Sequence, residues 1–138
     1  MNQRILSSLA TLLAAASAHA GDLKIEVSLP AARQGAVLAA VFDKADGFPS
    51  GKPLQTARAQ PVQGKATLQF AGLAKGDYAV TVFLDENANF KLDANLFGIP
   101  TELYGFSRNA RGHAGPPLFA DAAFRVDEGE QQQAIELK

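Results

Sequence analysis

The stretch GLAKGDYAVTVFLD, residues 72–85, decides the fold class of this 138-residue chain. Its second half alternates between two sets of side chains, and the apolar set consists of Tyr78, Val80, Val82 and Leu84. A repeat of two residues places successive side chains on opposite faces of a β-strand. The glycines at 72 and 76 come before the alternating part and indicate a turn that leads into it. The sequence therefore predicts a strand over Tyr78–Leu84, the strongest in the chain.

Six further segments have strand-like patterns and are separated by turn signals. The expected strands are Leu23–Leu29, Ala36–Asp43, Thr56–Val62, Ala66–Phe70, Ala122–Val126 and Ala134–Leu137. Ala36–Asp43 is continuously apolar, which favours a central strand, whereas Pro61 favours an edge position for Thr56–Val62. After residue 20 no window keeps a helical period with caps. About seven short strands at this spacing predict an all-β chain, folded as a single Greek-key β-sandwich.

The entry to the strongest strand has a recognisable form. Gly72-Leu73-Ala74-Lys75-Gly76-Asp77-Tyr78 resembles the G-L-x-x-G-x-Y-x-V entry of transthyretin-like and surface-protein B-type sandwiches. A buried tyrosine there needs a partner for its hydroxyl, and a backbone partner would fix the corner. We therefore expect a structural role for Tyr78.

Composition excludes several classes of function. The 13 basic and 14 acidic residues give a net charge of −1, without the basic excess of a nucleic-acid-binding protein. The chain has no cysteine, which excludes disulfides, thiolate zinc sites, iron–sulfur clusters and cysteine nucleophiles.

Residues 1–20, MNQRILSSLATLLAAASAHA, have the form of a secretory signal peptide. Arg4 supplies the positive region, an apolar run follows, and Ala18 and Ala20 place small residues at the cleavage site. The run is shorter than the roughly 20 apolar residues of a membrane span, and no second one follows. We expect cleavage after Ala20, a single domain over 21–138 with no transmembrane segment, and export to the periplasm or outside of a bacterium.

The segment that follows the strongest strand resembles a calcium-binding loop. Oxygen-bearing side chains fall at loop positions 1, 3, 5 and 9, as Asp85, Asn87, Asn89 and Asp93, and Lys91 would offer its carbonyl at position 7. This is the ligand spacing of an EF-hand loop, in which a hard cation collects alternate oxygens. Calcium is the one cofactor that the sequence suggests.

Two positions depart from that pattern, and a metal-free turn is the alternative. Position 6, normally glycine, is Phe90, and position 12, normally a bidentate glutamate, is Leu96. Affinity should therefore be weak, roughly 10⁻⁴–10⁻³ M, with a missing ligand from Glu86, Glu102, Asp121 or water. Asp and Asn also form turns without any ion.

A long segment without a clear period, Leu96–Phe119, comes next and is punctuated by glycines and prolines. Such a segment is usually functional or disordered. Its apolar side chains argue against disorder, and they are Leu96, Phe97, Ile99, Leu103, Tyr104 and Phe106. We expect an ordered, packed loop that covers one end or face of the sandwich.

Two interpretations remain open for the aromatic and basic residues of this segment, which are Tyr104, Phe106, Arg108, Asn109 and Arg111. They could grip an anionic or sugar-like ligand. Alternatively, the arginines could bind loop carbonyls or Asp121 and pin the segment down. His113 has no partner that the sequence can place beside it, and Ser107 has no base nearby, so no catalytic residue is assigned.

The second half of the chain carries a specific family resemblance. The pattern D-E-N-x-N-x-K-L-D-x-N-x-F-G-I-P-x-E-x-Y-G-F-S-x-N-A-R-G, followed by G-P-P-x-F-x-D-A-A-F, is similar to domain-of-unknown-function family 2141. The resemblance covers Leu23–Leu137 and implies a small exported bacterial protein without an assigned activity. Members usually carry glycine at the position of Phe90.

These observations lead to one main functional expectation and two alternatives. The main one is a non-enzymatic binding or structural module of the bacterial envelope, whose partner is an envelope component or a small ligand rather than nucleic acid. One alternative is a carrier of transthyretin-like type, which requires an apolar cavity beneath Phe97–Phe106. The other is a small hydrolase or lyase that uses Asp85, Asp93 and His113.

Overall fold

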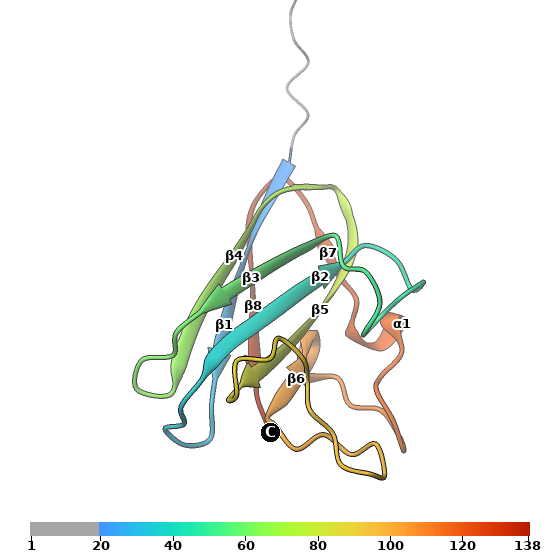
Figure 1. Cartoon of the computed structure of the whole chain (residues 1–138). Coiled ribbons are helices and arrows are strands. Elements are labelled where there is room, and N and C mark those ends of the chain that lie inside the picture. The colour runs from blue at the N-terminus through green and yellow to red at the C-terminus, as the bar shows by residue number, and fades with distance from the viewer. Residues whose placement is uncertain (1–19) are drawn as a thin grey trace, which may run out of the picture.

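The computed structural model describes residues 20–138 and confirms the β-sandwich fold (Figure 1). The expected signal peptide lies outside the described residues except for Ala20, at which strand β1 begins. The first sheet has the order β4-β1-β8, with β1 at Ala20–Ser28, β4 at Lys65–Ala74 and β8 at Gly129–Glu136. The second has the order β3-β2-β5-β6, with β2 at Ala36–Phe42, β3 at Gln55–Ala59, β5 at Gly76–Asp85 and β6 at Tyr104–Phe106. A further strand, β7 at Phe124–Val126, also pairs with β5.

The core lies between the two sheets and follows the alternation seen in the sequence. The first sheet contributes Leu23, Ile25, Val27, Leu68, Phe70 and Ile135. The second contributes Val37, Ala39, Val41, Val80, Val82 and Leu84. Each fully buried valine, leucine, isoleucine or phenylalanine side chain stabilises the fold by roughly 1.5–3 kcal/mol relative to exposure.

The start of β5 is fixed by Tyr78. Its side chain is buried, and its hydroxyl donates a hydrogen bond to the Ala74 carbonyl at 2.6 Å. Burial, with a smaller contribution from the charge of Asp43, raises the pKa of this hydroxyl above its ordinary value. The hydroxyl therefore remains a donor and ties β5 to the end of β4.

The strand boundaries differ from the expectation mainly in the last third of the chain. The Ala122–Val126 segment begins with helix α1, Phe119–Ala122, so only Phe124–Val126 is a strand. The last strand starts earlier, at Gly129, and runs parallel to β1. Strand β6 was not predicted, because three residues are too few to show a period. The sandwich therefore has eight strands rather than about seven.

The two sheets are joined along one edge. Tyr104 of β6 and Lys138 at the chain end exchange two backbone hydrogen bonds, at 3.1 and 3.0 Å. Lys138 follows β8, so the chain end connects the first sheet to the outermost strand of the second. Figure 1 shows β6 and the C-terminus side by side. This junction places the segment between β5 and β6 at one end of the second sheet.

Candidate functional site

The outward face of the second sheet is mostly apolar, unlike that of the first. The register aligns its outward side chains in three rows across the strands. The first row is Arg58, Leu38, Phe83 and Tyr104; the second is Thr56, Ala40, Thr81 and Phe106; the third is Phe42 and Ala79. On the first sheet the corresponding positions of β1 and β4 are polar, with Lys24 opposite Gln69 and Glu26 opposite Thr67. Strand β2 is therefore apolar on both faces, which explains its continuous apolar sequence.

The middle row creates a groove because its side chains on the three longer strands are short. Thr56, Ala40 and Thr81 stand between the larger side chains of the neighbouring rows. The groove has a volume of about 1130 Å³ and is open to solvent. Ligand sites are typically about 300–1000 Å³ and mostly apolar. The groove is thus large enough for a small molecule.

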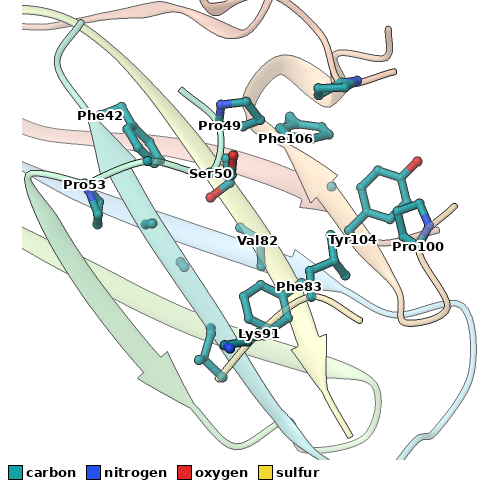
Figure 2. A pocket seen from close by; sticks show the side chains of 18 of the residues that line it. Phe42, Pro49, Ser50, Pro53, Val82, Phe83, Lys91, Pro100, Tyr104 and Phe106 are labelled. Atoms are coloured by element: carbon teal, nitrogen blue, oxygen red, sulfur yellow. The ribbon is translucent and has the colours of Figure 1, made fainter. Parts of the chain in front are cut away.

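Three connecting segments form the walls of this groove. They contribute residues from 49–53, from 90–100 and from 112–116. Figure 2 shows Phe42, Pro49 and Phe106 at one side of the floor, and Phe83 and Lys91 at the other. The walls therefore come from parts of the chain that are far apart in sequence.

Aromatic side chains form a cluster at the Phe42 end of the groove. Phe48 makes edge contacts with Phe42, Phe106 and Phe119, with ring centroids 5.4, 6.1 and 5.8 Å apart. Phe48, Phe106 and Phe119, together with buried Ala79 and Ala122, belong to a second hydrophobic core outside the sandwich. This second core anchors the 49–53 wall and helix α1 on the outward face of the sheet.

The loop that was expected to bind calcium follows β5 directly and is tightly wound. Asp85 is 3% exposed, and its carboxylate accepts hydrogen bonds from the Asn89 and Phe90 amides at 3.2 and 3.0 Å. Ala88 and Phe90 have φ angles of 56° and 61°. Phe90 thus has the left-handed conformation that glycine usually provides at loop position 6.

Asp93 is the point at which the loop side chains converge. Asn89 donates to its carboxylate at 2.6 Å, and Asn87 donates to the other oxygen. The hydrogen bonds from Asn89, then Asn87, lower the pKa of Asp93 below its ordinary value of 3.8. Four of the predicted ligand residues, Asp85, Asn87, Asn89 and Asp93, are therefore in one turn. The predicted ligand at Lys91 is its backbone carbonyl, and the Lys91 backbone belongs to the same turn, since its amide donates to the Asn89 side-chain oxygen at 3.0 Å. Its side chain lines the groove.

Glu102 holds both ends of this loop. It is 7% exposed, and its carboxylate oxygens accept hydrogen bonds from the Glu86 amide at 2.7 Å and the Asp93 amide at 3.0 Å. Within residues 20–138 no group of three or more His, Cys, Asp or Glu side chains is arranged to hold a metal. A cation here would depend on two carboxylates, the amide oxygens and the backbone.

The Leu96–Phe119 segment is ordered but only partly packed, which corrects the expectation. Leu96, Phe97 and Ile99 are 102%, 87% and 59% exposed, because they lie in a projecting turn that is closed by backbone bonds around Asn95. Tyr104 and Phe106 are packed instead, with their rings 5.8 Å apart. The projecting turn brings Phe97 and Ile99 to the groove wall.

The basic residues of this segment contact backbone rather than a cavity. Arg108 donates to the Ala123 carbonyl at 3.4 Å, and Arg111 donates to the Tyr104 carbonyl at 3.3 Å. The Arg111 guanidinium also lies 4.9 Å from the centre of the Tyr104 ring. Asn109 accepts a hydrogen bond from the Glu136 amide at 2.9 Å. These contacts correspond to the pinning alternative, and only Tyr104 and Phe106 of the five residues line the groove.

The residues of the hydrolase alternative do not meet in the groove. Asp85, Asp93 and His113 are all absent from its lining, and His113 is exposed in a loop. The Ser107 hydroxyl is fully buried and donates to the Ala122 carbonyl at 2.6 Å.

In the described part of the chain, no helix has the length and apolar character needed to cross a membrane.

Sequence reasoning missed the floor of the groove. The signal was present, because Leu38, Ala40 and Phe42 are apolar although they alternate with core residues. An apolar outward set on a strand indicates a surface that something else covers. The walls could not be inferred in the same way, since no local pattern brings residues 49–53 and 112–116 together.

Comparisons with known proteins give a family and no activity. The family described as "Uncharacterized protein conserved in bacteria (DUF2141)" matches residues 25–134. Among solved structures, a pilus-presented adhesin matches with a TM-score of 0.30 and 14% sequence identity, over 87% of this chain and 27% of the adhesin chain. No curated protein matches the chain.

Proposed function

The chain belongs to this family of uncharacterized bacterial proteins, and we propose that it is an exported, non-enzymatic module that binds a small, largely apolar ligand in the groove. The observation that carries the proposal is the groove of about 1130 Å³ over the short middle row of an apolar sheet face. Export rests on the signal-peptide pattern of residues 1–20.

Physical chemistry supports a ligand rather than a bare surface. An exposed apolar face of this kind is unfavourable in water, at about 25 cal/mol per Å². A ligand that displaces water from the floor recovers part of this free energy. The first sheet has no such face, so the apolar surface is a local feature rather than a general property of the fold.

Binding of a neutral environment-sensitive dye, such as Nile red, tests the proposal. We expect dye fluorescence to rise with the wild-type protein and to return nearly to background with Ala40→Phe, because the larger side chain fills the middle row. Gln69→Phe is the matched control, since it adds the same ring to the outward face of the first sheet. The proposal fails if both variants bind dye as the wild type does, or if the wild type binds none.

A second proposal concerns the Asp85–Asp93 loop, which we infer binds calcium weakly and thereby holds one wall of the groove. Its support is the left-handed conformation of Ala88 and Phe90 and the convergence of Asn87 and Asn89 on Asp93. The ligands would be Asp85, Asn87, Asn89, the Lys91 carbonyl and Asp93.

Thermal melting with added calcium tests this loop. Binding to the folded state should raise the melting midpoint. At a calcium concentration a hundred times the Kd, the free energy of unfolding would increase by about 2.7 kcal/mol. Asp93→Asn should remove most of the response, whereas Asp77→Asn, an exposed acid on β5, should keep it. Magnesium provides the ionic-strength control. An equal response to both ions, or none at several millimolar calcium, would exclude the ion.

A further inference from the structure

The charge of the groove is as informative as its shape. Of the described residues that line it, only Arg58 and Lys91 are charged, and both are basic. Neither forms an ion pair with an acidic side chain of residues 20–138. Lys91 makes only the smallest contribution to the lowered pKa of Asp93. The groove therefore combines a largely apolar floor with two basic side chains that form no ion pair within the described residues.

Both basic side chains are at one end of the groove. Arg58 is in the first row, directly beside Leu38, and its guanidinium lies 6.0 Å from the centre of the Phe90 ring. Lys91 follows Phe90 and lies near Phe83 in Figure 2, across the floor from Phe42 and Pro49. Leu38 and Phe42 are four residues apart, which corresponds to roughly 13 Å along a strand. The groove thus runs from a basic end to an aromatic end.

The floor offers few hydrogen-bonding groups to a ligand. Strand β2 is paired with β3 and β5, and β5 is paired with β2 and β6, so their backbone groups are already used. An extended peptide lying there would leave many of its own amides and carbonyls without partners. An alkyl chain has no hydrogen-bonding groups, so none of its groups is left without a partner when it lies on the floor.

From this charge and polarity we propose that the ligand is a single-chain anionic amphiphile of the fatty-acid type. Its anionic head lies beside Arg58 and Lys91, and its alkyl chain crosses the middle row at Ala40 and Thr81 towards the cluster of Phe42, Phe48 and Phe106. The inference rests on the proposed ligand-binding function and specifies the ligand class.

Displacement of bound Nile red by three ten-carbon amphiphiles tests the ligand class, using decanoate, decanol and decylamine. We expect decanoate to displace the dye at the lowest concentration and decylamine at the highest. In Arg58→Gln/Lys91→Gln the advantage of decanoate over decanol should fall roughly tenfold, because decanol has no charge for either side chain to attract. Lys24→Gln/Lys65→Gln on the first sheet is the matched control for the change of charge, and it should behave as the wild type.

Added salt gives a test that needs no variant. Raising sodium chloride to 1 M shortens the screening length to about 3 Å and should weaken decanoate but not decanol. Equal displacement by all three compounds would overturn the ligand class and leave the binding function intact. Stronger displacement by a neutral apolar peptide would also overturn it. If the dye does not bind at all, the binding function itself fails.

Discussion

Ser107 shows how one side chain can replace a missing strand partner. Strand β5 pairs with β7 at its start and with β6 near its end, and Val80 lies between these two pairings. The Ser107 hydroxyl accepts the Val80 amide at 2.9 Å and donates to the Ala122 carbonyl at 2.6 Å. A single buried hydroxyl therefore serves one backbone donor and one acceptor.

Replacing Ser107 should be costly for its size. Ser107→Ala leaves the Val80 amide and the Ala122 carbonyl without these partners, so we expect a loss of about 2 kcal/mol in the free energy of unfolding. Urea denaturation measures it. Ser50→Ala, at an exposed serine, is the control and should change stability by less than about 0.5 kcal/mol. A loss no larger than that of the control would show that water replaces the hydroxyl.

Phe90 carries backbone strain that its side chain does not offset through burial. It is 65% exposed and has a φ of 61°, a region that costs a non-glycine residue about 1–2 kcal/mol. Phe90→Gly removes this strain but gives the unfolded chain more conformational freedom, which offsets part of the gain. We expect a net increase of about 0.5 kcal/mol in the free energy of unfolding. Leu92→Gly, at a residue without positive φ, should lower it. Equal losses in urea denaturation would mean that Phe90 is not strained.

The contrast between Tyr78 and Ser107 explains which residue roles the sequence predicts. Tyr78 bonds to Ala74, four residues away, within the glycine-bounded turn that the sequence displays. The partners of Ser107 are 27 and 15 residues away. The role of Tyr78 can be predicted from local spacing in the sequence. The role of Ser107 cannot, because it depends on how β5, β6 and α1 pack together.

At the scale of elements, the loop after β5 depends on a glutamate that lies outside it. Glu102→Gln replaces one acceptor oxygen with a donor, which cannot serve both the Glu86 and the Asp93 amides. We expect these amides to exchange with deuterium about ten- to a hundredfold faster, because each lost buried bond is worth about 1–3 kcal/mol. Glu86→Gln, at an exposed side chain paired with Arg33, is the control. Unchanged exchange at both amides would contradict this role of Glu102.

Element prediction succeeded where a strand contributes to the main core. The strands around Tyr78–Leu84 and Ala36–Asp43 were located from their apolar patterns. The first pattern is an inner face of the sandwich, and the second includes one in Val37, Ala39 and Val41. Strand β6 and helix α1 were missed, because each is short and is stabilised by the second core, which contains Phe48, Phe106 and Phe119. The second core also borders one end of the groove through Tyr104 and Phe106, so the walls of the groove were as hard to predict as these elements.

At the scale of the whole molecule, the sandwich depends on close contact where β6 meets the chain end. A Cβ atom at Gly105 would lie 2.8 Å from the Glu136 carbonyl oxygen and 2.9 Å from the Ile135 side chain. Tyr104 and Phe106, on either side of it, face the groove. The absence of a side chain at Gly105 thus lets the groove-lining strand approach the first sheet.

Gly105→Ala should therefore affect stability and ligand binding together. We expect a loss of about 1–3 kcal/mol from overpacking, because backbone and branched side-chain atoms must move. Gly115→Ala is the control: it lies on a groove wall, its Cβ would meet nothing within 4 Å, and its φ is not positive. That variant should be unchanged or more stable by up to about 1 kcal/mol. Urea denaturation and Nile red binding, measured on both variants, test this prediction. Normal stability in Gly105→Ala would mean that β6 and β8 can separate without cost and that the groove does not depend on their contact.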